Sequence, residues 1–368
     1  MPRIISAALI GSLMFMVSPA AAARDDDDDP KVAGRKSSEW LAMLQKDQTA
    51  KRRRAAVIAL GILGPKVKGV VEGLSTALRK DTDAEVRRAS AQTLGQMGAE
   101  ARGAIELLAE ALKEDKEGAV RATAATALGR MGTGAKPAIP ILTGALKDKH
   151  AGTRAAAAES LGLIGPDAAD AVPSLIETLK DADRFVRTYA AYALGRMGQK
   201  ASDAVPSLAR VLADDAHPSV REAAADALGQ MGTQASEATP ALAKALKDKQ
   251  VDVRRKAAVV LGKIGRDAKS ALPALTEALK DSDKYVRGHA IHAISSLGKD
   301  AAADAVPALA ARLKDDVLEV QLAAAGALGQ LGPEAKAAVP ALKEALGDRR
   351  LVVRDAAAEA LKKIEGKK

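Results

Sequence analysis

The spacing of apolar residues predicts two helices within each short stretch of chain, and residues 170–198 show this most clearly. Leu175 and Leu179 follow Pro173 at helical spacing, and proline fits the first turn of a helix. A second apolar stripe recurs at i, i+4, i+8 and i+11 and consists of Val186, Ala190, Leu194 and Met197. The pattern therefore predicts a short helix pair, with the polar residues between the stripes forming the connection.

Polar residues and glycines mark the ends of these two helices. Asp181 and Asp183 predict a turn and the start of the second helix, where carboxylates accept free backbone N–H groups. Gly198 predicts a C-terminal cap. Gly195 lies inside the second helix, where glycine costs about 1 kcal/mol, so we expect close backbone contact between neighbouring helices there. This internal glycine recurs at Gly61, Gly95, Gly129, Gly162, Gly229, Gly262 and Gly329.

The same two-helix unit occurs ten times. Its most regular marker is an arginine that recurs at Arg53, Arg87, Arg121, Arg154, Arg187, Arg221, Arg254, Arg287 and Arg354, with Gln321 in the ninth place. Successive markers are 33 or 34 residues apart, and a fixed period in this range indicates a stack of identical supersecondary units. The sequence thus predicts an all-α superhelix, or solenoid, of about ten two-helix repeats.

Composition agrees with thin layers of helices and narrows the range of partners. The chain of 368 residues is 48% hydrophobic but only 2% aromatic, so Ala, Leu and Val must fill the core. It has no cysteine, which excludes disulfides, thiolate metal sites and a cysteine nucleophile. The net charge of +9 favours acidic partners or is simply a surface with a slight excess of lysine. Because aromatic stacking platforms are scarce, we expect no nucleic-acid partner.

The N-terminus has the pattern of a secretory signal peptide. A positive start at Arg3 precedes an apolar run over residues 4–17 and A-x-A sites, so we expect cleavage near Ala22 or Ala23. A retained N-terminal anchor is the alternative. Residues 24–37, with five consecutive aspartates, are expected to form a flexible acidic leader. The solenoid would occupy residues 38–365, the basic tail residues 366–368, and the product would be exported to the periplasm or the extracellular space.

The proline-opened first helix, the turn aspartate, the Val-Arg pair and the Ala-Leu-Gly ending resemble HEAT repeats, most closely the short class named after phycobilisome lyase subunits. The ankyrin signature T-P-L-H and the large aromatics of tetratricopeptide repeats are absent. The resemblance covers residues 38–365 and implies an aspartate–arginine ladder between neighbouring units. The pairs six residues apart are Asp47/Arg53, Asp81/Arg87, Asp115/Arg121, Asp148/Arg154, Asp181/Arg187, Asp248/Arg254, Asp281/Arg287, Asp315/Gln321 and Asp348/Arg354. The remaining unit is interpreted as Asp214/Arg221, one residue longer.

The ladder interpretation competes with a functional one. The arginines could instead form a basic track for a ligand. Because each arginine comes with a carboxylate of its own unit, we favour the structural role. The two ends of the array are expected to differ from its middle, with Trp40 covering the exposed apolar start and Leu361–Glu365 providing a polar finish.

Function is expected where units depart from their own consensus. Two residues before, two after and five after the marker arginine share one face of the second helix, and most units place small or polar residues there. The exceptions, in the fifth and eighth units, are Phe185, Tyr189, Tyr192, Tyr285, His289 and His292. By resemblance, second helices line the concave surface, so these stripes would face one groove, three units or roughly 25–30 Å apart. They are either binding anchors or rings that fill gaps left by alanine.

No catalytic constellation stands out from the repeat. Deoxyhypusine hydroxylase, an enzyme with HEAT-type repeats, holds iron with His-Glu pairs, and no histidine here is followed by glutamate. His289 and His292 have no evident third ligand, so we expect no metal and no cofactor. We therefore expect a non-enzymatic, exported scaffold that binds a protein or peptide along the concave face. The alternatives are a lyase-like or chaperone-like subunit acting on a modified protein, and a module that binds an acidic polymer.

Overall fold

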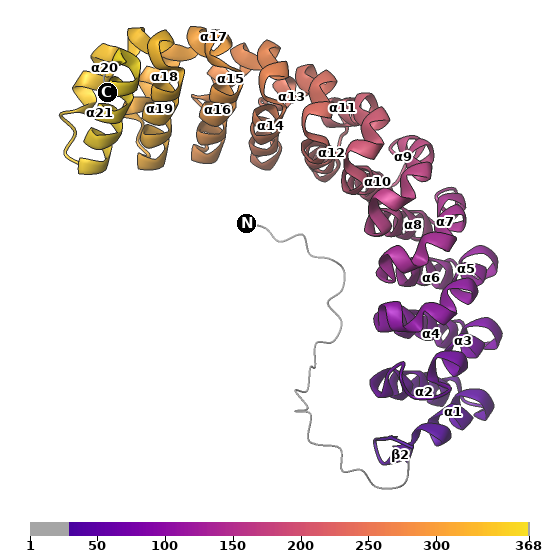
Figure 1. Ribbon diagram of the computed structural model, residues 1–368. Coiled ribbons are helices and arrows are strands. Elements are labelled where there is room, and N and C mark those ends of the chain that lie inside the picture. The colour runs from indigo at the N-terminus through magenta and orange to yellow at the C-terminus, as the bar shows by residue number, and fades with distance from the viewer. Residues whose placement is uncertain (1–28, 367–368) are drawn as a thin grey trace.

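A computed structural model describes residues 29–366 of the chain, and within them ten helix pairs follow one another along an arc (Figure 1). The expected signal peptide, residues 24–28 of the acidic leader and the last two residues of the basic tail lie outside the described part. Since the apolar stripes recur in every unit, each helix pair can bury its apolar face only against the next pair. The predicted all-α solenoid is confirmed.

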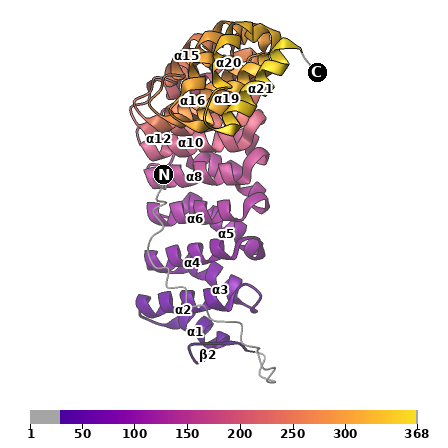
Figure 2. The same cartoon turned by 90° about the vertical axis from the view of Figure 1, so that its left-hand side faces the viewer.

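The first helices of the units form the outer, convex side of the arc and the second helices form the inner, concave side (Figure 1). The outer helices are α1 (Ser37–Lys46), α3 (Val70–Lys80), α5 (Ile105–Glu114), α7 (Ile139–Ala145), α9 (Val172–Thr178), α11 (Val205–Asp214), α13 (Thr239–Ala245), α15 (Leu272–Ala278), α18 (Val306–Ala311) and α20 (Val339–Ala345). The inner helices are α2 (Ala50–Leu63), α4 (Ala84–Met97), α6 (Gly118–Arg130), α8 (Ala151–Ile164), α10 (Arg184–Met197), α12 (Pro218–Met231), α14 (Val251–Ile264), α16 (Lys284–Ser296), α19 (Leu318–Leu331) and α21 (Leu351–Glu365). Seen from inside the arc, α2, α4, α6 and α8 lie above one another like rungs (Figure 2).

Short 3₁₀ segments, which the apolar pattern did not predict, connect most units. From α4 onward they lead from an inner helix towards the next outer helix. They are η1 (Gly98–Ala104), η2 (Gly132–Ala138), η3 (Gly165–Ala171), η4 (Gly198–Ala204), η5 (Gly232–Ala238), η6 (Gly265–Ala271), η7 (Ala303–Ala305) and η9 (Gly332–Ala338). The short helix α17 (Lys299–Ala302) precedes η7, and η8 (Arg312–Lys314) extends the end of α18. Alanines of these segments, such as Ala168 and Ala171, are buried, so the connections belong to the core.

The fifth unit shows why the sequence folds in this way. Pro173 lies in the first turn of α9, where its missing N–H leaves no bond unmade. The Asp183 carboxylate accepts the N–H groups of Phe185 and Val186 at 2.8 and 3.2 Å and caps α10. Gly198 ends α10 with a φ of +58°, a conformation that glycine adopts without strain. The residues of the second apolar stripe are all buried, as the pattern predicted.

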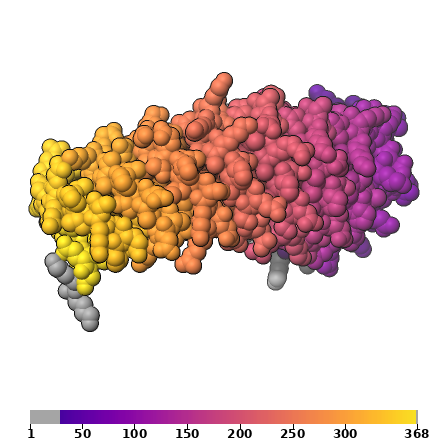
Figure 3. Space-filling view, turned by 90° about the horizontal axis from the view of Figure 1, so that it is seen from above, coloured from indigo at the N-terminus to yellow at the C-terminus, as the bar shows by residue number. Residues whose placement is uncertain are grey.

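The inner helices approach each other at the recurring glycine. A Cβ added at Gly195 would lie 2.8 Å from the Cα of Ala227, and one at Gly95 would lie 2.7 Å from the Cα of Ala127. Side chains at these positions would force the helices apart, which explains why the repeat accepts the cost of glycine inside a helix. The expected backbone contact is confirmed. The result is one hydrophobic core, built mainly of alanine and leucine, that continues from unit to unit. From outside, the units form one continuous body (Figure 3).

The start of the described chain differs from the flexible acidic leader that the sequence predicts. Residues 31–36, expected to be flexible, form a hairpin of β1 (Lys31–Val32) and β2 (Arg35–Lys36). The indole N–H of Trp40 donates to the Val32 carbonyl at 3.0 Å, so the hairpin lies against the buried ring that begins the array. Asp29 accepts the N–H groups of Ser37 and Ser38 at 2.8 and 3.2 Å. The hydrogen bond from the Ser37 hydroxyl, followed by that from Ser38, lowers the pKa of Asp29 to about 2. The composition pattern could not show this tertiary capping of α1.

None of the helices in the described chain is both long enough and apolar enough to cross a membrane.

Candidate binding surface on the concave side

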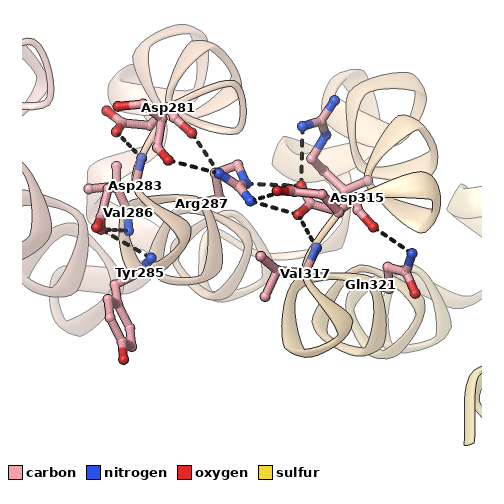
Figure 4. Close-up of polar contacts among 11 residues, drawn as sticks. Asp281, Asp283, Tyr285, Val286, Arg287, Asp315, Val317 and Gln321 are labelled. Carbon is pink, nitrogen blue, oxygen red and sulfur yellow. Dashed lines mark hydrogen bonds and ion pairs between the residues drawn. The ribbon is translucent and has the colours of Figure 1, made fainter.

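The marker arginines bond to the unit that follows them. In the eighth unit, Arg287 donates from Nε and Nη2 to the two carboxylate oxygens of Asp315 at 2.9 and 2.7 Å (Figure 4). Its Nη1 donates to the main-chain carbonyl of Asp281 at 2.9 Å. One guanidinium thus ties the turn of its own unit to the turn of the next, which is a strong, bidentate arrangement. The ladder between neighbouring units that the resemblance implied is therefore present, and the aspartate of the arginine's own unit contributes only its carbonyl.

Eight such links run through the array. They are Arg53–Asp81, Arg87–Asp115, Arg121–Asp148, Arg154–Asp181, Arg187–Asp215, Arg221–Asp248, Arg254–Asp281 and Arg287–Asp315. The sixth unit contributes Asp215, and the assignment of Asp214 to this position is therefore wrong. Asp215 lies six residues before Arg221, as in the other units, whereas Asp214 is exposed and pairs with Lys244 at 3.0 Å.

The ladder carboxylates are charged groups that need their arginines. Burial by itself raises the pKa of Asp115, but hydrogen bonds from Arg87 and from the Glu117 N–H outweigh it and leave the pKa below its usual value. At the ninth step Gln321 cannot form the same fork. Its amide nitrogen donates to the Asp315 carbonyl, its oxygen accepts from Arg350 at 2.6 Å, and Arg350 pairs with its neighbour Asp348 at 2.9 Å. With their donors directed at carboxylates and carbonyls, these arginines are unsuited to a ligand track.

The six unusual side chains of the fifth and eighth units lie on inner helices. Phe185 and Tyr192 on α10 are 55% and 37% exposed, and Tyr285 on α16 is 54% exposed. His292 is exposed as well, whereas Tyr189 and His289 are half-buried. Each stripe is brought together on one helix face, and the two stripes are separated by α12 and α14 (Figure 1). Exposed rings on the inner side of an arc are the arrangement that a binding role requires.

Contacts between units partly support the gap-filling alternative. A Cβ at Gly162 of α8 would lie 3.4 Å from Cδ1 of Tyr192, and one at Gly262 of α14 would lie 3.6 Å from Cδ2 of His292. The residues five after the arginine therefore cover the glycine of the preceding unit. Phe185 and Tyr285, two before the arginine, have no such glycine beneath them and remain more than half exposed.

The eighth stripe is held by its neighbour α14. Arg255 donates from Nε and Nη2 to the Asp283 carboxylate at 2.9 and 2.5 Å, and its guanidinium carbon lies 4.9 Å from the centroid of the Tyr285 ring. The Arg255 hydrogen bond lowers the pKa of Asp283 to about 2. Burial lowers the pKa of His289, and electrostatic interactions with His292 and Arg255 lower it further. His289 is therefore a neutral imidazole near pH 7, beside a tyrosine fixed by a cation.

The fifth stripe borders a cavity instead. A space of about 340 Å³ extends over α4, α6, α8 and α10, with a floor of small residues such as Gly152 and Ala155. Tyr189, Arg130 and Glu159 line it. Burial, with the Glu159 carboxylate as the next cause, raises the pKa of the Tyr189 phenol. Burial also raises the pKa of Glu159, which Arg130 only partly opposes.

One apolar feature of the concave side was missed at the sequence level. Ile58 and Ile62 on α2 are 59% and 69% exposed and border a cavity of about 490 Å³ together with Arg54, Arg88 and Gln92. The sequence did contain a signal, because Ile58 stands five residues after Arg53, where most other units carry polar residues.

Among residues 29–366 no group of three or more histidine, aspartate or glutamate side chains is placed to hold a metal ion. His289 and His292 thus have no third ligand of these types in the described structure.

Comparison with known proteins gives the architecture and little more. A family model described as HEAT repeats matches overlapping windows over residues 37–129, 71–162, 105–195, 139–229, 172–263, 205–295, 239–317 and 272–362. A search of curated proteins found no match to the sequence.

Solved structures resemble the chain in fold. The crystal structure of an engineered protein from the Northeast Structural Genomics Consortium is similar with a TM-score of 0.62 and 23% identity, over 89% of this chain and 99% of that one. Kap95p, in a structure with RanGDP, is similar with a TM-score of 0.57 and 15% identity, over 89% of this chain and 50% of that one. A chain in a homology model of the AP-3 complex is similar with a TM-score of 0.64 and 13% identity, over 90% of this chain and 69% of that one. Identities this low establish the fold alone.

Proposed function

Because this chain belongs to the HEAT-repeat family, we propose that it is a non-enzymatic scaffold that binds a protein or peptide segment along its concave side. The observation that carries the proposal is the exposure of Phe185, Tyr192 and Tyr285 on inner helices, at positions where most other units present small or polar side chains. Covering a large aromatic ring that is exposed to water lowers the free energy of the complex, and such rings dominate the affinity of many interfaces. The likeness in fold to Kap95p, whose structure describes its binding to RanGDP, supports a protein-binding role.

We further propose that the scaffold acts outside the cytoplasm. The apolar run and A-x-A sites of residues 1–23 support export followed by cleavage near Ala22 or Ala23. The partner would then be an exported protein, or a segment of one, that meets the groove in the periplasm or the extracellular space.

Affinity capture from the native extracytoplasmic fraction tests this proposal. The bait is residues 24–368, and the test variant replaces Tyr189, Tyr192, Tyr285 and His289 with alanine. The matched control replaces Ser219 and Asp226, which occupy the same repeat positions in the sixth unit. A protein retained by the bait and the control but lost by the variant, with all three equally stable, supports the groove. Equal capture by all three baits would contradict it.

Salt dependence separates this proposal from binding to an acidic polymer. Binding through aromatic burial changes little between low and moderate salt, whereas binding to a polyanion weakens steeply because counterions are released. A steep loss of the captured partner as salt rises would therefore favour the polymer.

A further inference from the structure

Glu159 on α8 is a half-buried carboxylate for which the structure records no hydrogen bond or ion pair among residues 29–366. The other half-buried carboxylates that face the groove do have partners. Glu222 lies 3.4 Å from Lys256, and Asp252 lies 3.1 Å from Arg255. A carboxylate that is partly withdrawn from water without a partner costs free energy, so its position calls for a function.

The surroundings of Glu159 match one kind of ligand group. Arg130, the cation that lowers the pKa of Glu159, is exposed, and the described structure records no ion pair between the two. Tyr189 lines the same cavity of about 340 Å³, whose other walls are glycine and alanine residues together with Gln92, Thr123 and Thr126. A carboxylate, an aromatic wall and an apolar floor together suit a long side chain with a positive end. The methylenes of such a chain lie on the floor, and its charge meets the carboxylate and the ring.

We propose that the cavity over α4, α6, α8 and α10 binds a lysine or arginine side chain of the partner. This inference rests on the proposed function, since it specifies the chemistry that the concave side recognises. It also explains why Glu159 is unpaired, because a cation from the partner completes the pair when it binds. In agreement with this, burial raises the pKa of Glu159, which an approaching ammonium or guanidinium group would reverse.

The inference can be tested without knowing the partner. The probe is Nα-acetyl-lysine methylamide, with the norleucine analogue as a neutral probe of similar length. NMR titration of the mature chain follows the Tyr189 and Tyr192 signals. We expect the lysine probe to bind and the norleucine probe to bind at least tenfold more weakly. Equal binding of the two probes would overturn the inference.

Two variants locate the effect. Glu159→Gln should weaken the lysine probe at least tenfold and leave the norleucine probe unchanged. The matched control is Glu359→Gln, because Glu359 stands at the same repeat position in the last unit and already pairs with Lys363 at 2.6 Å. The control should bind the lysine probe as the native chain does. Unchanged binding by Glu159→Gln would overturn the inference.

A measurement on the native chain guards against a variant that fails to fold. The carboxyl carbon of Glu159 is titrated by NMR with and without the lysine probe. The titratable groups that line the cavity beside it are Arg130 and Tyr189. We expect the pKa of Glu159 to fall when the probe is present, and an unchanged pKa would overturn the inference. A different result would contradict the proposed function, namely capture of the partner by the variant in which Tyr189, Tyr192, Tyr285 and His289 are replaced with alanine.

Discussion

The fifth and eighth units carry similar stripes of large side chains, but the contacts that each stripe makes with the preceding unit differ. In the seventh unit Arg255 reaches forward to Asp283 and lies against Tyr285. The residue at the equivalent place in the fourth unit is Ala155, so Asp183 receives no arginine and a cavity lies beside the stripe. Arg255 and Asp283 are 28 residues apart, as are Ala155 and Asp183. The eighth stripe therefore satisfies its charges within the protein, whereas the fifth leaves a carboxylate and a cavity that a partner can fill.

Removing a ladder arginine beneath the fifth stripe should have the largest effect. Arg187→Ala leaves the nearly buried Asp215 carboxylate without its bidentate partner, which we expect to cost on the order of 3 kcal/mol in the free energy of unfolding. Urea unfolding measures it, with the exposed Arg184→Ala as the control. Partner binding by the folded fraction should persist, because the guanidinium does not face the groove. An unfolding free energy equal to that of the native chain would contradict a structural ladder.

Converting the fifth stripe to the eighth arrangement tests the comparison itself. In Ala155→Arg the introduced guanidinium can reach Asp183 and occupy the cavity, so we expect at least tenfold weaker binding of the lysine probe with unchanged or higher stability. Thr188→Arg adds the same charge where no aspartate follows 28 residues later, and it should bind the probe normally. If both variants lose the probe equally, net charge and not the cavity would be responsible.

The reverse change weakens the eighth stripe. Arg255→Ala removes the two hydrogen bonds to Asp283 and the cation over Tyr285, and both partners are partly exposed. We therefore expect a loss of only about 1 kcal/mol in stability. The Tyr285 ring should gain mobility, visible as narrower ring signals in NMR relaxation. Ring signals identical to those of the native chain would show that Arg255 does not fix the tyrosine.

The smallest effect is a pH dependence that belongs to the eighth stripe. Arg255 lowers the pKa of Asp283 to about 2, below the value of about 3.9 for an unfolded chain. The stabilisation is therefore complete above pH 4 and is lost as the pH falls towards 2. The stability difference between the native chain and Asp283→Asn should shrink over this interval. A difference that stays constant from pH 5 to pH 2 would contradict the assigned pKa.

The sequence predicts those features of the fold that depend on spacing within one unit. Pro173, Gly195 and Gly198 have the roles that were predicted, because each acts on the helix that contains it or on the adjacent copy of the same unit. The ladder between neighbouring units is present as the resemblance implied, but the spacing within one unit did not show which carboxylate each arginine contacts. Arg187 bonds to Asp215, and which carboxylate reaches it depends on how consecutive units are stacked.

The candidate site was predicted in part for the same reason. The stripes were found by comparing units at equivalent positions, and the structure places them on the inner helices. The unpaired state of Glu159 was not visible in the sequence, because the cavity is formed by side chains of four inner helices. Likewise, the capping of α1 by Asp29 joins residues eight and nine positions apart, which no helical or strand periodicity indicates.

Site-specific photocrosslinking would test the central claim most directly. A photoreactive phenylalanine analogue is placed at position 192 or 285 on the inner helices, or at position 177 or 277 on the outer helices, where exposed glutamates stand. The account predicts that the two inner positions crosslink to one and the same exported protein and that the outer positions do not. Crosslinks from the outer positions, with none from the inner ones, would contradict the assignment of the concave side as the binding surface.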